Sequence, residues 1–421
     1  MKSMRYILFF LMIPISVCAF ANRETDSLIN IAQKYEKQTH FESDINYINT
    51  LIRVAESLLY INPDSSFLFA EKAYNLSIKH KYHKSSIKAA FIIGDIYTLK
   101  RDPEKIMWIV NEILPVIEKT DRKSLGNLYS LYGASYVYKG IFDINNLLDA
   151  KNMFQKSLEI GKEYNDTVIM ISAIANLSVI HDAMLDYSQA VELLYQAIGL
   201  TERSKNNDTD DIIMLFHNVS SIYFGQKMYD KALVEIHNAL NLTDSVSHSV
   251  RYGGCLLLAS KICLALNDLD KALEYTNMCI DVSQKLNFRV ESLEAQKILS
   301  TIYCKKGLYD KALKIANEVL VEYEKSGTDF DIIYVKLLIS DIYYAKKQYD
   351  LGLKICNEIL ERNSVSASIL GSIHIIKSRI YEAQNNGMKA LEHYKLYKIF
   401  SDSLYHNNLD EQIIKIGRAH V

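Results

Sequence analysis

Proline and glycine are scarce in this chain of 421 residues, with 4 prolines and 15 glycines. Sheet proteins need many tight turns, and tight turns draw heavily on these two residue types. The shortage therefore argues against a β fold and favours long helices joined by short loops. Hydrophobic residues make up 49% of the chain, which is enough for a packed core and too many for a disordered protein.

An excess of charge of either sign is also missing. The chain carries 48 basic and 50 acidic residues, so its formal net charge is −2. Such a balance creates no general field that would draw a nucleic acid or an anionic membrane surface to the protein. We therefore expect no nucleic-acid partner for this segment.

The motifs of the common catalytic and cofactor sites are absent from the sequence. It contains no G-x-x-x-x-G-K-[ST], no G-x-S-x-G and no H-E-x-x-H. The eleven histidines are scattered; His80 and His83 are interpreted as surface residues, with metal ligation as the alternative. We predict a protein that is not an enzyme, with no catalytic site, no metal site and no cofactor.

Cysteine carries no recognisable site either. No C-x-x-C occurs, and no histidine lies at metal-ligand spacing from a cysteine. Five cysteines lie beyond the N-terminal segment, and an odd number cannot all pair within one chain. We interpret them as small buried side chains of helices. They are Cys255, Cys263, Cys279, Cys304 and Cys356.

The N-terminus has the pattern of a secretory signal peptide. Lys2 and Arg5 precede an apolar run from residue 6 to residue 17, and Ala19-Phe20-Ala21 fits a cleavage site. The run is shorter than a membrane span of about 20 residues. We expect residues 1–21 to be removed and the protein to be exported, either periplasmic or attached to a membrane on its periplasmic side. The alternative is a lipoprotein signal with Cys18 as the lipidated residue.

One phrase returns at a fixed interval in the second half of the chain. "MYDKALVEI", "DLDKALEYT" and "LYDKALKIA" begin at residues 228, 268 and 308, so they are 40 residues apart. An apolar stripe at i, i+3, i+4 and i+7 precedes each phrase, and a second stripe follows it. These spacings are typical of amphipathic helices. Each interval is therefore predicted to be a helix, a tight turn and a second helix.

The phrase itself contains signals for a helix start and for close packing. We expect the aspartates of the phrase to cap the second helices. Asp102, which precedes Pro103 in a different local sequence, is expected to cap a helix in the same way. Gly140 and Gly307 are expected to end first helices in the left-handed conformation. The capping aspartates are Asp230, Asp270, Asp310 and Asp350. The small residues expected where the second helix crosses the first are Ala190, Ala232, Ala272, Ala312, Gly352 and Ala390.

This pattern resembles the tetratricopeptide repeat. Leu299-Ser300, Tyr303, Gly307, Tyr309 and Ala312 carry the motif most fully, and further small residues recur near Ser178, Ser220, Ser260, Ser340 and Ser378. The resemblance implies an all-α fold, an α-solenoid or superhelix of about nine stacked antiparallel helix pairs. It covers residues 45–400, after an N-terminal lead-in at 22–44. The interval of 40 residues is longer than the usual 34 and resembles a long-helix subtype of bacterial signalling proteins.

The resemblance also implies where a partner would bind. The first helix of each pair is expected to line a concave face, and the residue after the small position of that helix is expected to be exposed there. No cation repeats at this position, so the peptide clamp of the chaperone-binding members is not implied. The ligand could be a protein, a peptide or a glycan fragment. The predicted partner-binding residues are Ser221, Lys261, Thr301, Asp341 and Arg379.

The C-terminus suggests a truncated chain. Residues 401–415 are predicted to be an exit helix, and residues 416–421 can be back-translated as ATC GGA AGA GCA CAC GTC, the sequence of a widely used DNA sequencing adapter. The exit helix resembles that of exported repeat domains in Bacteroidetes-type signalling proteins. We therefore expect the sensory region of a signal-transduction protein, a histidine kinase or helix-turn-helix regulator, with an inner-membrane anchor in the missing sequence. The alternative is a free-standing exported scaffold.

Overall fold

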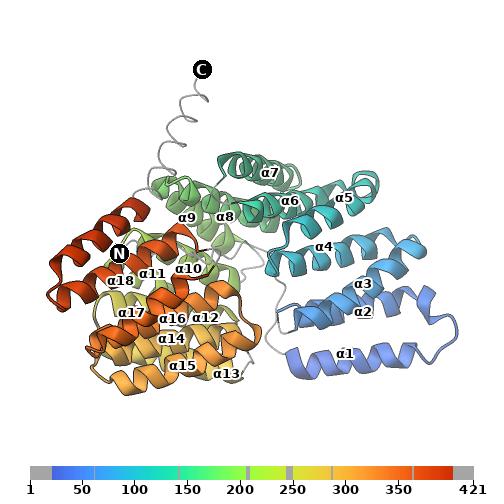
Figure 1. The fold of residues 1–421 in the computed structure, drawn as a ribbon. Coiled ribbons are helices and arrows are strands. Elements are labelled where there is room, and N and C mark those ends of the chain that lie inside the picture. The colour runs from blue at the N-terminus through green and yellow to red at the C-terminus, as the bar shows by residue number, and fades with distance from the viewer. Residues whose placement is uncertain are drawn as a thin grey trace. The chain divides into compact units, whose positions relative to one another are not determined.

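The fold was analysed in a computed structural model, which describes residues 21–60, 62–140, 143–204, 209–242, 250–285, 288–362 and 365–401. Every regular element in these ranges is helical, as the sequence predicts (Figure 1). Two short 3-10 helices lie at Phe41–Ser43 and Arg122–Ser124. Residues 387–401 form a further helix after α18. The α-helices are α1 Ala21–Tyr35, α2 Ile45–Leu58, α3 Pro63–Lys79, α4 His83–Leu99, α5 Pro103–Thr120, α6 Leu125–Lys139, α7 Ile144–Glu163, α8 Thr167–Ala183, α9 Tyr187–Arg203, α10 Thr209–Gly225, α11 Tyr229–Asn241, α12 Val250–Ala265, α13 Leu269–Lys285, α14 Arg289–Lys305, α15 Tyr309–Ser326, α16 Asp329–Ala345, α17 Tyr349–Leu360 and α18 Ala367–Ala383.

From α1 to α10 and again from α13 to α18, consecutive helices pack against one another, so these stretches form antiparallel pairs. The predicted pairs are α2 with α3, α4 with α5, and so on to α18 with helix 387–401. The predicted all-α fold of stacked helix pairs is confirmed. The lead-in at 22–44 contains α1, which packs on α2; the boundary at residue 45 stays a prediction.

The chain divides into two compact units. The N-terminal unit contains α1–α10, the C-terminal unit contains α13–α18, and the boundary passes through α11 and α12. Within each unit the first helices of successive pairs also contact one another, for example α4 with α6 and α14 with α16. Second helices make no contact of that extent among the described elements. The first helices therefore form a continuous layer in each unit, on what we call the inner face.

The helix starts differ from the prediction in one respect. Asp102 does cap α5, since its carboxylate accepts a hydrogen bond from the Lys105 amide (3.2 Å). Asp270, however, is the second residue of α13, and it is Asp268 that accepts from the Lys271 amide (3.1 Å). The expected caps at Asp230, Asp310 and Asp350 are likewise second residues of their helices. At the second position a carboxylate still interacts favourably with the positive end of the helix dipole, but it does not cap the helix.

These second-position aspartates instead link successive pairs. The ammonium of Lys306, at the end of α14, donates to Asp270 of the preceding pair over 2.6 Å. Lys346 donates to Asp310 over the same distance, forty residues later. Both aspartates are highly exposed, and exposed ion pairs contribute little to stability. The links therefore set the register between pairs more than they add stability.

The turn between the helices of a pair uses one left-handed residue. Gly307 has φ 77°, as predicted. The equivalent residues Lys227, Asn267 and Lys347 each have φ 63° although they carry a Cβ, which is an unfavourable conformation for them. The prediction for Gly140 was wrong, because its φ of 169° is extended backbone.

The small residues lie at the helix crossings, as predicted. Ala190, Ala232, Ala272 and Ala312 are each fully buried. A Cβ added at Gly352 would come within 3.1 Å of the Ile380 side chain. A larger side chain at any of these positions would push the two helices apart.

Three predictions concern residues outside the described ranges. The signal peptide at 1–21 lies there except for Ala21, the exit helix at 401–415 lies there except for Ser401, and residues 416–421 lie there entirely. Within the described ranges, no helix combines the length and the apolar character that crossing a membrane requires.

Candidate functional site

Four of the five predicted binding residues lie in the C-terminal unit, on successive first helices. Lys261 is on α12, Thr301 on α14, Asp341 on α16 and Arg379 on α18. Each directly follows a serine of its first helix, so all four occupy the same register of the inner face. The serines are Ser260, Ser300, Ser340 and Ser378. Ser221 is on α10 of the N-terminal unit.

The expectation that these residues are exposed was wrong. Ser221 is buried, with 7% of its surface exposed, and the other four are half-buried. The reason is that the first helices contact one another directly, so each side chain on the inner face is flanked by the next helix. Solvent reaches these side chains, but neighbouring helices surround them.

Asp341 and Arg379 form an ion pair across the inner face. A guanidinium nitrogen of Arg379 donates to the Asp341 carboxylate over 3.1 Å, and the guanidinium also lies over the ring of Tyr344, 5.5 Å from its centroid. Burial raises the pKa of Asp341, and Arg379 opposes that shift. The two charges cancel locally, so they are not presented to a ligand as separate charges.

Lys261 lies in a second polar group on the same face, which the sequence interpretation missed. Burial lowers the pKa of Lys261, and the nearby carboxylate of Glu294 opposes this shift. Glu294 itself forms an ion pair with Lys297 and accepts a hydrogen bond from the Tyr323 hydroxyl (3.2 Å). Thr301 does not add a free donor, because its hydroxyl donates to the Lys297 carbonyl (3.0 Å).

The missed residues follow a simple spacing. Glu294 and Lys297 precede Thr301 by seven and four residues, so they lie on the same helix face, two turns and one turn earlier respectively. In the N-terminal unit, Asp95 on α4 follows the small residue Gly94 and is the counterpart of Asp341. Burial raises the pKa of Asp95 well above its usual value. These positions could have been found by extending the register along each first helix.

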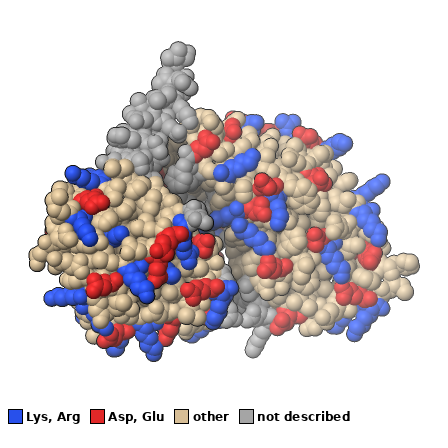
Figure 2. Space-filling view, viewed as in Figure 1, with Lys and Arg blue, Asp and Glu red and all other residues tan. Residues whose placement is uncertain are grey.

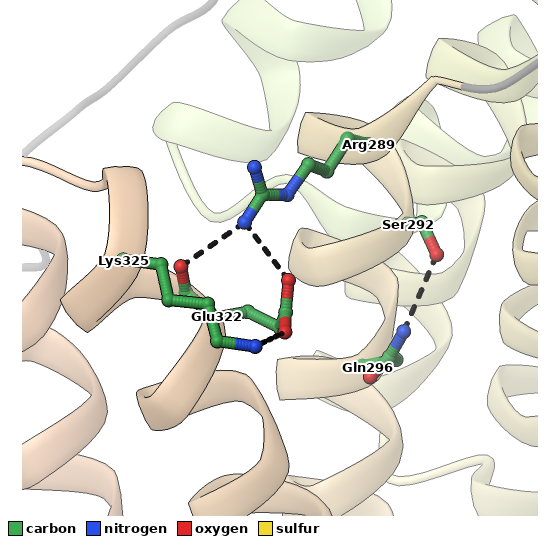
Figure 3. A network of polar contacts seen from close by, with 5 residues as sticks. All are labelled: Arg289, Ser292, Gln296, Glu322 and Lys325. Carbon is green, nitrogen blue, oxygen red and sulfur yellow. Dashed lines mark hydrogen bonds and ion pairs between the residues drawn. The ribbon is translucent and has the colours of Figure 1, made fainter.

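Away from the inner face, the ends of the helices in a pair are tied by ion pairs. Arg289 at the start of α14 donates to the carboxylate of Glu322 (2.8 Å) and to its main-chain carbonyl (3.1 Å) near the end of α15. Lys325 donates to the same carboxylate (2.7 Å), as Figure 3 shows. Close by, Gln296 donates to Ser292 over 3.3 Å. The two contacts of Arg289 fix how the start of α14 meets the end of α15, whereas the bond from Gln296 to Ser292 lies within α14.

Basic and acidic side chains are interspersed over the surface in view in Figure 2, without a large area of one sign. One open depression of about 460 Å³ lies along α17. Its described lining residues belong to that single second helix or, in the case of Glu361, directly follow it, so the depression is not part of the inner face. They are Asp350, Leu353, Lys354, Asn357, Glu358 and Glu361.

Four of the five cysteines are buried, as predicted. Among the five, Cys304 is half-buried and the others are buried, and none forms a disulfide in the described structure. Burial raises the pKa of Cys263 and of Cys279 to about 11, so both remain thiols at neutral pH. Within the described ranges, no three His, Cys, Asp or Glu side chains are grouped as metal ligands would be.

The chain resembles known proteins more extensively in fold than in sequence. No protein-family profile matches the chain. Over 177 residues, 42% of this chain, it is 26% identical to the BBSome complex member BBS4 of Bos taurus. That stretch is 29% of the bovine protein, so the chain matches less than a third of this relative.

Solved structures resemble almost the whole chain. The apo form of RapI has a TM-score of 0.60 at 11% identity and covers 85% of this chain and 98% of RapI. A Rap protein in complex with competence and sporulation factor has a TM-score of 0.56 at 13% identity, covering 86% of this chain and 99% of its own. A STAND signal-transduction ATPase of Pyrococcus horikoshii with a tetratricopeptide-repeat sensor has a TM-score of 0.51 at 15% identity, covering 90% of this chain and 55% of its own. At such identities the likeness shows the fold alone: the chain has the fold of tetratricopeptide-repeat proteins.

Proposed function

We propose that this chain is a non-catalytic binding module that holds a protein or peptide partner against the inner face of its first helices. The observation that carries the proposal is the state of the polar residues on that face. They are reached by solvent, surrounded by neighbouring helices and already ordered by one another, as Asp341 and Arg379 are. Ordered polar groups of this kind can bind a shaped partner with little further loss of side-chain entropy.

The pattern of charges favours one shaped partner over a repetitive polymer. Along one register the inner face carries a half-buried lysine, a hydroxyl that is already engaged, and a closed ion pair, in that order. A polymer with one charge per unit would need the same group on each first helix. Binding should therefore depend only modestly on salt, unlike binding to a chain of phosphates.

The comparisons support a partner of this kind. One similar structure is of a Rap protein in complex with competence and sporulation factor, and another belongs to a signal-transduction ATPase whose repeats are described as a sensor. By analogy of fold, we propose that this chain is the extracytoplasmic sensory region of a signal-transduction protein, exported by its N-terminal segment. A free-standing exported scaffold is the second candidate.

Photo-crosslinking in the native cells tests the binding face. The photoreactive residue p-benzoylphenylalanine replaces Thr301 on the inner face of α14 in one variant. In the matched control it replaces Lys314, whose side chain is 78% exposed on α15. We expect a discrete crosslinked product from the Thr301 position and none from the Lys314 position. Crosslinking from Lys314 alone would contradict the proposed face.

Sequencing the intact gene beyond residue 415 separates the two candidates. An apolar run of about 20 residues soon after that point supports a membrane-anchored sensor. A natural stop codon supports the scaffold. Fractionation of cells that express the full gene then tests export, which requires that the protein be found outside the cytoplasm.

A further inference from the structure

Four aromatic rings form a stack at the end of the C-terminal unit. In order they are Tyr381, His393, His374 and Phe400, with centroids separated by 5.4, 5.1 and 5.6 Å and planes inclined by 7°, 19° and 6°. Tyr381 and His374 belong to α18, and His393 and Phe400 belong to helix 387–401. The two helices therefore contribute alternate rings, and the stack joins them.

The two central rings are also joined by a hydrogen bond. The Nδ1 atoms of His374 and His393 are 3.0 Å apart, and His374 is buried, with 8% of its surface exposed. At this distance one Nδ1 carries a proton and the other offers its lone pair. A single added proton can be accommodated, but if both rings are protonated, two N–H groups face each other and two positive charges meet.

The surroundings of the pair contain more cations than anions. Lys377 of α18 donates to Asn357 of α17 (2.9 Å) and lies close enough to disfavour charge on both imidazoles. On helix 387–401, Lys389 lies over the Tyr381 ring (5.2 Å to its centroid) and Glu392 is the nearby carboxylate. Two other elements pack against α18. Of these, α17 contributes the thiol of Cys356, which burial keeps protonated, and α16 contributes Asp341, which is already paired with Arg379.

Helix 387–401 depends on this contact more than an interior helix would. Its outer side is open: Met388 is 84% exposed, Leu391 52% and Ile399 60%. In the preceding pairs, the residues equivalent to Leu391 are Leu313 and Leu353, which are partly buried against the next first helix. The attachment of helix 387–401 therefore comes mainly from α18, through the ring stack and the hydrogen bond of Ser378 to Ala390 (2.8 Å).

We propose that the four-ring stack is a pH-operated clasp, which fastens helix 387–401 to α18 at neutral pH and releases it in mild acid. The physical basis is the second proton, which breaks the His374–His393 hydrogen bond and places two imidazolium ions in contact beside Lys377. Released from α18, the helix loses its packing partner, and the apolar faces of both helices become available.

The direction of the pH dependence follows from the two histidines. Burial, together with the neighbouring ring and Lys377, lowers the pKa of His374 from 6.5 to about 4, and burial lowers the pKa of His393. In the detached state both rings are free to titrate near 6.5, so that state binds more protons. The contribution of the clasp is therefore complete above about pH 6.5 and declines as the pH falls towards 4. The two rings titrate as a coupled pair.

Hydrogen exchange on the full chain tests the clasp. Protection of the amides in residues 387–401 is measured between pH 7.5 and 4.5, corrected for the intrinsic exchange rate, with α14 as the internal reference. We expect protection of 387–401 to fall at least tenfold across this range while that of α14 changes little. Undiminished protection at pH 4.5, or an equal loss in every helix, would overturn the proposal.

Two variants make the test specific. The double variant His374→Phe, His393→Phe keeps four aromatic rings but removes both titratable imidazoles. Residues 387–401 should therefore keep their protection at pH 4.5. The matched control, His83→Phe at an exposed position of α4, should behave as the wild type does. If the double variant loses protection in acid as the wild type does, the histidines are not responsible. Should the double variant already be unprotected at pH 7.5, NMR titration of ¹³C-labelled histidine in the wild type decides. The clasp requires that the ring of lowest pKa titrate in step with the loss of protection.

Discussion

The hydroxyl of Ser300 donates a hydrogen bond to the main-chain carbonyl of Ala312, 2.8 Å away and twelve residues further along the chain. Ser340 makes the same bond to the carbonyl of Gly352 over 2.9 Å, and the spacing of twelve residues recurs from Ser260 to Ala272 and from Ser378 to Ala390. The repeated phrase therefore places a small residue where the second helix approaches close enough for a serine of the first helix to reach its backbone.

Changes at this crossing should be costly. Ala312→Leu should lower the free energy of unfolding by roughly 1–3 kcal/mol, since the added side chain forces α14 and α15 apart. Ser300→Ala should cost about 1 kcal/mol, the usual net value of one buried hydrogen bond. The control Lys314→Ala, at an exposed position, should cost under about 0.5 kcal/mol. Urea denaturation followed by circular dichroism measures all three, and equal effects at Ala312 and Lys314 would contradict the crossing.

Gly307 and Lys347 occupy the same left-handed turn position forty residues apart, which offers a reciprocal test. Gly307→Ala should destabilise the chain by about 1 kcal/mol, because φ is 77° there and a Cβ is unfavourable at that angle. The reverse change, Lys347→Gly, should stabilise it by about 0.5–1 kcal/mol. The space around Gly307 is open, so a steric clash cannot account for the first result. Thermal unfolding of the two variants should move the midpoint in opposite directions.

The ion pairs at the helix ends have exchanged signs between successive pairs. Arg289 and Glu322 join α14 to α15 at 2.8 Å, while Asp329 and Arg362, each forty residues later, join α16 to α17 at 3.1 Å. Arg289→Asp alone should be mildly destabilising, and adding Glu322→Arg should recover only part of that loss, because Lys325 then loses its carboxylate partner. The coupling should fade in 1 M salt, where the screening length is about 3 Å. Purely additive effects of the two changes would show that the pair contributes nothing.

Asp95 should make stability depend on pH. Its carboxylate has no hydrogen-bond or ion-pair partner among the described residues, and burial raises its pKa well above 3.8. Folding therefore favours the protonated form, so the contribution of Asp95 is most favourable below pH 3.8 and is lost as the pH rises through the folded pKa. Asp95→Asn should stabilise the protein at pH 7.5 and progressively less towards pH 4. Urea midpoints measured across this range would show a gap that widens with pH; a constant gap would contradict the assignment.

The sequence predicts the helices and their crossings well because both depend on local spacing. The apolar period marks each helix, and the burial of Ala312 follows from its place in that period. Helix starts are less certain: α15 begins at Tyr309 after Leu308, which is not a capping residue. Asp310, two positions later, interacts favourably with the positive end of the helix dipole. The sequence pattern alone therefore cannot distinguish an aspartate that caps a helix from one in its first turn.

The inner face is only partly predictable, because its chemistry depends on distances between helices. The register places Asp341 and Arg379 on one face, but their pairing across 38 residues depends on how closely α16 and α18 approach. The desolvation of Lys261 likewise depends on the surrounding helices. The His374–His393 contact gave no sequence signal, since the two residues are 19 positions apart and belong to no motif.

The links from Lys306 to Asp270 and from Lys346 to Asp310 are separated by forty residues at both ends. Excising residues 289–328, which include α14 and α15, would therefore bring Lys346 to the position that Lys306 holds opposite Asp270. In the shortened chain Lys346 could pair with Asp270, so the link between neighbouring pairs would be kept. A chain in which the same stretch was duplicated would keep these links as well. We expect the gene to lengthen or shorten by this unit without loss of folding, so that the number of repeats can change in evolution more easily than the composition of any one of them.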